Sequence, residues 1–407
     1  MLLRKNHAFR HLFIVRILSI FANSVMFFSL LKWLEIQTGS SDVFTFFYVA
    51  FYLPVTLFAL PIGTWINDKT LQKVMTYANL LQVVMLLVFL CFSPYLAYQW
   101  IYPLLVIISV LGLFFVPANQ SLLPHIVEVE ARPKANSLLQ LGYTGVKVSG
   151  QIFTAFMIKL SFAPLALLAV SAILLLLSIL FIRKIKPVIK NEQIVKQNQW
   201  KMMKDGISYI ITNAVLKTLF LFLALAMFFV SSVELILISF LNDILNAGVE
   251  NLSFIGTASL CGIAVGAAIA PYVYHRMERK GLIVSPLFAL SISIGTLFFV
   301  TNWLLILPVF FLQGIALGCF NITFVTYLQN VISSENYTRT FSLYNMIMSS
   351  MALPGIIVTG LFLEVIGVLY TVLVQGGILF CIGILGIFII PKLGRHEDNN
   401  KKRTNAV

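Results

Sequence analysis

Residues 164–182 read PLALLAVSAILLLLSILFI, a run without a single charged side chain. A helix rises 1.5 Å per residue, so about 20 apolar residues cross the roughly 30 Å hydrocarbon core of a bilayer. Apolar windows of this length recur from Leu12 to Ile390 with only brief charged interruptions. The run and its repeats predict an all-α membrane protein that contacts the lipid bilayer along most of its length.

The composition agrees with a membrane location. Of the 407 residues, 59% are hydrophobic and only 11% are charged, which leaves too little polar surface to cover a soluble globule. The net charge of +13 would suggest a nucleic-acid partner in a soluble protein. Here the basic residues gather in alternate loops, so the positive-inside rule explains them. We therefore expect no nucleic-acid partner and two cytoplasmic termini.

The hydrophobic pattern predicts twelve transmembrane helices in two six-helix pseudo-repeats. The predicted spans are 12–34, 44–66, 74–92, 101–123, 136–159, 164–182, 215–241, 252–274, 282–302, 304–331, 341–363 and 367–390.

The halves are separated by a polar stretch with the composition of a solvated linker. Beyond it, Trp200, Met203 and Ile207 recur at helical spacing, which predicts a short amphipathic helix along the cytoplasmic interface. We predict an N-terminal lobe at 1–183, an interlobe loop with this helix at 184–212, a C-terminal lobe at 213–391, and a cytoplasmic tail at 392–407.

A faint internal duplication supports two parallel repeats. Ser149-Gly150 is echoed by Pro354-Gly355, and Gly112 by Gly318, at a nearly constant offset.

The sequence lacks the residue patterns that several classes of function require. The four cysteines lie singly in apolar runs, without the spacing of a metal site or a disulfide framework. No glycine-rich lysine loop, paired carboxylates or nucleophile elbow occurs. We expect no cofactor, no metal and no enzymatic activity, and we expect an ion gradient rather than ATP as the energy source.

The loop after the second predicted span carries a recognisable motif. It reads LPIGTWINDK at 60–69, followed by Lys73-Val74-Met75. This resembles the loop signature of the major facilitator superfamily, in which a glycine and an acidic-basic cluster surround a short cytoplasmic turn. Phe9-Arg10, Thr38-Gly39-Ser40 and 205–210 (DGISYI) resemble the macrolide-efflux and enterobactin-exporter branch of that superfamily, so the resemblance spans nearly the whole chain.

The resemblance implies a conformational switch at Gly63, Asn67, Asp68 and Lys73. The chain departs from the family pattern, because Asn67 stands at the usual Asp and Asp68 at the usual Arg. The negative charge of Asp68 either interacts favourably with the positive N-terminal end of the eleventh predicted helix, or it is an ordinary solvated loop charge.

Lys147 is a cation deep within the fifth predicted span, roughly 17 Å from its cytoplasmic entry. The glycines that remain of the family's antiporter signature surround it, at 142, 145 and 150. An ammonium at this depth requires a wet cavity or an anionic partner. Lys147 either recognises a substrate anion or takes part in charge coupling, or it is a structural lysine satisfied by carbonyls or a fixed carboxylate.

Glu234 is the only carboxylate well inside a predicted span. Removal of a carboxylate from water favours its protonated form, so we predict that Glu234 is the proton-coupling residue. The alternative is that Glu234 lies in the outer third of the membrane and touches external water.

The first span carries a polar stripe of Arg16, Ser19 and Asn23, spaced so that the three side chains share one direction. Either they line a substrate cavity or they form interhelical hydrogen bonds. The resemblance places the fourth and tenth spans beside the central cavity, where Asn119, Gln120, Gln313 and Asn321 become candidate substrate contacts. Hydrogen bonds between helices are the alternative for these four residues.

The leading functional hypothesis is a monomeric secondary transporter in a bacterial plasma membrane. It would export an amphipathic small molecule that can be anionic, a drug-like compound or a siderophore, by proton antiport with alternating access. The alternatives are a flippase for lysophospholipid-type lipids and a non-transporting membrane sensor or scaffold.

Overall fold

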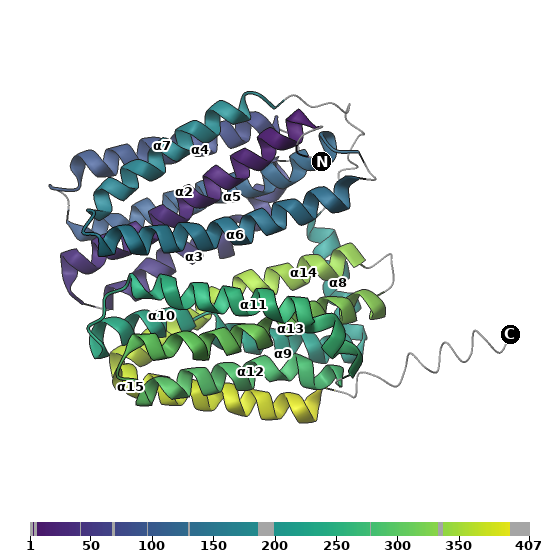
Figure 1. Cartoon of the computed structure of the whole chain (residues 1–407). Helices are drawn as coiled ribbons and strands as arrows, with labels where there is room; N and C mark the ends of the chain where they lie inside the picture. The colour runs from purple at the N-terminus through teal and green to yellow at the C-terminus, as the bar shows by residue number, and fades with distance from the viewer. Residues whose placement is uncertain are drawn as a thin grey trace. The chain divides into compact units, whose positions relative to one another are not determined.

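The computed structural model is built of helices (Figure 1). It describes residues 3, 6–40, 42–66, 70–95, 97–128, 131–185, 199–276, 278–332 and 337–390, and none of these forms a strand. The chain divides into two compact units. Unit 1 comprises Met1–Lys196 together with Gly248–Phe254, and unit 2 comprises Gln197–Ala247 and Ile255–Val407.

The described residues of unit 1 form six long helices, which correspond to the first six predicted spans. They are α2 (His7–Thr38), α3 (Asp42–Ile66), α4 (Leu71–Phe92), α5 (Ile101–Leu122), α6 (Arg132–Lys159) and α7 (Pro164–Ile182).

Unit 2 begins with the predicted amphipathic segment, which is helix α8. Its described helices are α8 (Gln199–Thr212), α9 (Ala214–Val230), α10 (Val233–Ser239), α11 (Asn251–Arg276, with its first turn in unit 1), α12 (Arg279–Thr296), α13 (Ile306–Val331), α14 (Tyr337–Ser350) and α15 (Ala352–Ile389).

Two predicted spans are interrupted in the structure. The seventh, predicted as one helix, is α9 and α10 separated by a turn at Ser231 and Ser232, followed by a π-helical turn at Phe240–Ile244. The eleventh is divided at Met351 between α14 and α15. Pro354 accounts for this second break, because a proline has no N–H to donate to the carbonyl three or four residues earlier.

Nine helices in the described part of the chain are long and apolar enough to cross a membrane. The last, Met346–Ile389, is too long for one crossing at 1.5 Å per residue. The non-helical backbone of Gly367, with φ 75° and ψ 172°, divides α15 into two helices at that residue. Many large apolar side chains lie uncovered on the helices, as at Phe388, which is 80% exposed and suited to contact with lipid.

The two units repeat the same packing pattern. In unit 1, α2 packs against α6 and α7, and in unit 2, α9 packs against α14 and α15. Gly150 of α6 contacts the Ser24 side chain of α2, and Gly355 of α15 contacts the Phe228 carbonyl of α9. Gly150 and Gly355 therefore make corresponding helix contacts in the two halves, whereas the second predicted pair does not, because a Cβ at Gly112 meets no atom within 4 Å and one at Gly318 meets α11.

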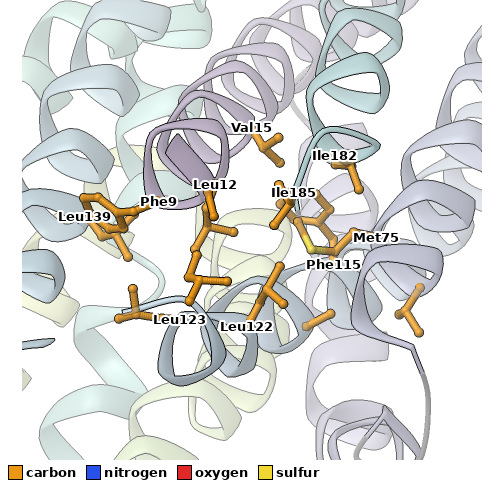
Figure 2. Close-up of a cluster of buried hydrophobic side chains, with 14 of the residues drawn as sticks. Phe9, Leu12, Val15, Met75, Phe115, Leu122, Leu123, Leu139, Ile182 and Ile185 are labelled. Carbon is orange, nitrogen blue, oxygen red and sulfur yellow. The ribbon is translucent and has the colours of Figure 1, made fainter. Parts of the chain in front are cut away.

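Unit 1 has a buried apolar core where α2, α4, α5, α6 and α7 converge (Figure 2). The core includes residues of α2 and α6, the helices that carry Arg16 and Lys147. The residues labelled in Figure 2 are Phe9, Leu12, Val15, Met75, Phe115, Leu122, Leu123, Leu139, Ile182 and Ile185.

In unit 2, α11 and α13 approach each other backbone to backbone. Each contributes a glycine pair four residues apart, Gly262 with Gly266 and Gly314 with Gly318. A Cβ atom added at any of these four glycines would overlap a main-chain carbonyl oxygen of the opposing helix. Small residues at this spacing let membrane helices pack closely, and here they hold the helix that carries Gln313 and Asn321.

Candidate functional site

Arg16 lies half-buried on α2, about 14 Å along the helix from His7. Its Nη1 atom donates to Oδ1 of Asn119 on α5 over 3.4 Å, and its guanidinium carbon lies 6.0 Å from the ring centroid of Tyr143 on α6. Within the described residues, no carboxylate oxygen lies within 4.0 Å of Arg16. The predicted candidates Arg16 and Asn119 thus meet, and Tyr143 joins them.

Asn119 is only 2% exposed. Its Oδ1 contacts Arg16, whereas its Nδ2 finds no hydrogen-bond acceptor among the described residues. The neighbouring candidate, Gln120, is exposed on the same helix. Consecutive helical residues point about 100° apart, so the two amides face different surroundings.

The three residues of the predicted polar stripe on α2 contact different neighbours. Ser19 turns toward α4 and α7, where its Oγ lies 2.9 Å from Oγ of Ser178, and Nδ2 of Asn79 donates to both hydroxyls. Asn23 donates to the carbonyl of Ser19 in its own helix over 2.7 Å. Ser19 is therefore an interhelical contact, while Arg16 faces α5 and α6. The three-residue spacing rotates the side chains by about 60°, enough to reach different neighbours.

Lys147 lies half-buried on α6, about 22 Å along the helix from Arg132. No described carboxylate lies within 4.0 Å of it, so the fixed-carboxylate alternative has no candidate in that part of the chain. Its own carbonyl accepts from Oγ of Ser24, and Gly150 packs on the same serine. The glycines around Lys147 hold α6 against α2, because Gly142 also contacts Phe13 and Ile17.

Glu234, the predicted proton-coupling carboxylate, lies on the surface of unit 2. Glu234 is exposed in the first turn of α10, immediately after the break that follows α9. The sequence predicted one continuous helix here, whereas the structure has α9 and α10. The role of Glu234 in proton coupling stays a prediction.

A buried polar network holds this break. Gln375 of α15 donates from Nε2 to the Phe229 carbonyl and to Oγ of Ser232, both over 2.8 Å. Its Oε1 accepts from Oγ1 of Thr359 over 3.1 Å. Gln375 is 1% exposed, and sequence reasoning did not select it. Its signal was an isolated amide inside an apolar span, which requires a partner on another helix.

Gln313 and Asn321 lie on α13 in unit 2. Gln313 is buried and accepts from Oγ of Ser259 on α11 over 3.1 Å, whereas Asn321 is half-buried. Gln313 also borders a cavity of about 20 Å³ otherwise lined by apolar side chains of α9, α12 and α13. This volume suits about one water molecule, and the role of Gln313 as a substrate contact stays a prediction.

Most of the predicted conformational switch lies outside the residues whose side chains the structure describes. Asn67 and Asp68 are outside the described residues, and of Gly63 the structure gives only its position in α3. Lys73 is exposed in the first turn of α4.

An ion-pair cluster at the far end of α2 was not predicted. The Lys32 ammonium lies 2.6 Å from a carboxylate oxygen of Glu35 and 2.8 Å from one of Glu250. Glu35 also accepts from the backbone N–H of Val249 over 3.0 Å. These contacts bind the segment Gly248–Phe254, from the second half of the sequence, into unit 1. In the described part of the chain, no group of three or more potential metal ligands occurs.

Comparison with known proteins assigns the family. The profile of the Major Facilitator Superfamily matches residues 12–242 and 219–406. The chain belongs to the major facilitator superfamily. This confirms the predicted resemblance and the all-α fold of two six-helix repeats. A major facilitator protein is a membrane transporter, so this chain is a transporter and not an enzyme.

Named relatives of this major facilitator protein cover almost its whole length. It is 25% identical over 418 residues to the uncharacterized MFS-type transporter YvqJ of Bacillus subtilis (strain 168), covering 98% of this chain and 96% of the relative. It is 23% identical over 381 residues to macrolide efflux protein A of Streptococcus pyogenes, covering 90% and 92%.

Solved structures support the same fold at lower identity. The crystal structure of the nucleoside transporter NupG superposes with a TM-score of 0.76 at 13% identity, covering 94% of this chain and 98% of NupG. A bacterial homolog of the human lysosomal transporter Spinster gives 0.74 at 12% identity, covering 96% and 97%. This major facilitator protein is thus a multi-pass membrane protein that acts on a small molecule.

Proposed function

We propose that this transporter exports an amphipathic, anionic small molecule from the bacterial cytoplasm by proton antiport with alternating access. The observation that carries the proposal is the distribution of charge along the spans. Arg16 and Lys147 place two cations in the helices of unit 1, without a described carboxylate within 4.0 Å. Glu234 places a carboxylate in unit 2.

This division of charge suits two different ligands. Cations at membrane depth favour a substrate anion, since an uncompensated charge there is unfavourable. A carboxylate exposed at a helix break is able to exchange a proton with water. The efflux function named for the Streptococcus pyogenes relative supports export as the direction. The apolar side chains on the same helices suit the rest of an amphipathic molecule.

The proposal includes a location and an organisation. The transporter would lie as a monomer in the plasma membrane with both termini in the cytoplasm, as the alternate basic loops indicate. The four segments 1–183, 184–212, 213–391 and 392–407 would be two lobes, a linker with its interfacial helix, and a tail.

Uptake of candidate substrates into inverted membrane vesicles tests the mechanism. An imposed proton gradient is expected to drive accumulation in the parent, and a protonophore is expected to abolish it. Glu234→Gln should retain substrate exchange but lose proton-driven accumulation, and Lys147→Ala should weaken substrate binding. Glu364→Gln, at an exposed carboxylate three residues before the Gly367 kink of α15, is the matched control. Unchanged transport in both test variants would refute these assignments.

A lipid flippase is the second candidate, because a lysophospholipid combines an apolar chain with a phosphate that the same cations would attract. Movement of a labelled lysophospholipid between leaflets without a proton gradient would favour this candidate over antiport.

A further inference from the structure

Most of the N–H donors of the Arg16 guanidinium have no hydrogen-bond acceptor among the described residues. An arginine carries five N–H donors in a planar fork, and its charge is permanent. Among the described residues, the hydrogen bonding of Arg16 consists of the 3.4 Å contact with Oδ1 of Asn119. Its positive charge lies on a membrane-spanning helix, with the Tyr143 ring against it and no described carboxylate within 4.0 Å.

Asn119 supplies a second donor at the same place. Its Nδ2 is buried and has no acceptor among the described residues, although buried amide groups nearly always have one. Covalent geometry keeps this nitrogen beside the Oδ1 atom that Arg16 contacts. Two helices, α2 and α5, therefore bring together a permanent cation and an unused neutral donor.

The ligand that satisfies both groups is an oxyanion. A neutral hydroxyl can accept from both donors but leaves the charge of Arg16 uncompensated, and a cation would be repelled. A carboxylate or phosphate offers a pair of oxygens that can accept two parallel N–H···O bonds from the arginine fork. Lys147 lies one helical turn beyond Tyr143 on α6 and adds a second positive charge on that face.

We propose that Arg16 and Asn119 form an oxyanion-binding site for the carboxylate or phosphate group of the transported molecule. This assignment rests on the transport function proposed above, and it restricts the substrate class to acids.

A pair of probes that differ only in charge tests the site. Dansylglycine carries a free carboxylate, and its methyl ester is the neutral counterpart with the same fluorophore. Both are titrated against the purified full chain in lipid nanodiscs, with dansyl fluorescence as the readout. The parent protein is expected to bind the acid about tenfold more tightly than the ester, since charge-assisted hydrogen bonds are the strong class. Displacement of dansylglycine by benzoate or by phenyl phosphate then distinguishes carboxylate from phosphate preference.

Variants at Arg16 and Asn119 test whether these two residues cause the preference for acid over ester. Arg16→Gln should bind acid and ester equally, and Arg16→Lys should keep part of the preference because it keeps the charge without the fork. Asn119→Asp should abolish acid binding by giving Arg16 a carboxylate of its own. Arg10→Gln is the control on the same helix, where Arg10 contacts His7 instead. It should keep the full preference.

Equal affinity of the parent for acid and ester would overturn the proposal, as would an undiminished preference in Arg16→Gln. If Arg16→Gln does not give a monodisperse protein, Asn119→Leu decides the matter by the same criterion. The titrations need no proton gradient. Acid preference without proton-driven efflux would therefore refute the transport mechanism alone, and efflux without acid preference would refute the site alone.

Discussion

Gln375 donates from its side-chain Nε2 to the backbone carbonyl of Phe229 over 2.8 Å, and this bond joins the last helix of unit 2 to the broken seventh span. The break frees carbonyls at the end of α9 that a continuous helix would have satisfied. The hydroxyl of Ser232 donates to the same carbonyl over 3.0 Å. Two side chains thus stabilise the turn from which Glu234 emerges.

Replacement of Gln375 by leucine should destabilise this turn. The variant leaves the Phe229 carbonyl with one donor fewer and Oγ1 of Thr359 without its acceptor. We expect a loss of about 1–2 kcal/mol in unfolding free energy, the upper range for hydrogen bonds between membrane helices. The labelling rate of a cysteine at position 234, in a background without the four native cysteines, should also change. Gln37→Leu, at an exposed position, is the control, and equal effects of both changes would contradict the assignment.

The glycine contact between α11 and α13 should tolerate no methyl group. Gly266→Ala would place a Cβ against the carbonyl oxygen of Ile315. The two helices would have to move apart to make room for it. We expect a loss of about 1–3 kcal/mol or more, as for overpacked cores. Gly377→Ala on α15 meets no atom within 4 Å and should be neutral or slightly stabilising. Thermal unfolding in detergent compares the two, and similar melting temperatures would argue against the close approach.

The cluster of Lys32, Glu35 and Glu250 should behave as an energetically coupled unit. Lys32→Met leaves two largely buried carboxylates without a counter-ion, and we expect a clear loss of stability. Glu250→Gln should cost less in the Lys32→Met background than in the parent. A double-mutant cycle measures this coupling, which should exceed about 0.5 kcal/mol. Strictly additive effects would show that the ion pair does not hold Gly248–Phe254.

Asn79 should matter for the packing of unit 1 rather than for transport specificity. Its Nδ2 donates to Ser19 and Ser178 at the meeting of α2, α4 and α7. Asn79→Leu removes both bonds and should lower the unfolding free energy by about 1 kcal/mol. The ratio of acid to ester binding should stay at the parent value. A variant of normal stability with altered ligand preference would place Asn79 in the site instead.

The sequence by itself determined the membrane-spanning character, the family signature and the ionisable residues inside the spans. These follow locally, because a membrane helix satisfies its backbone hydrogen bonds within itself and its length must match the bilayer. Arg16, Asn119, Lys147 and Glu234 were recognisable for the same reason, as polar groups in apolar runs.

Only the tertiary structure decided which of these groups meet. Arg16 contacts a residue 103 positions away, and Glu250 joins a lysine 218 positions away. Such partners depend on the rotation of each helix about its axis, which apolar side chains on all faces leave undefined in the sequence. The packing of glycines and buried cores sets that rotation, and with it the pairing of Arg16 with Asn119, the turn held by Gln375 and the exposure of Glu234.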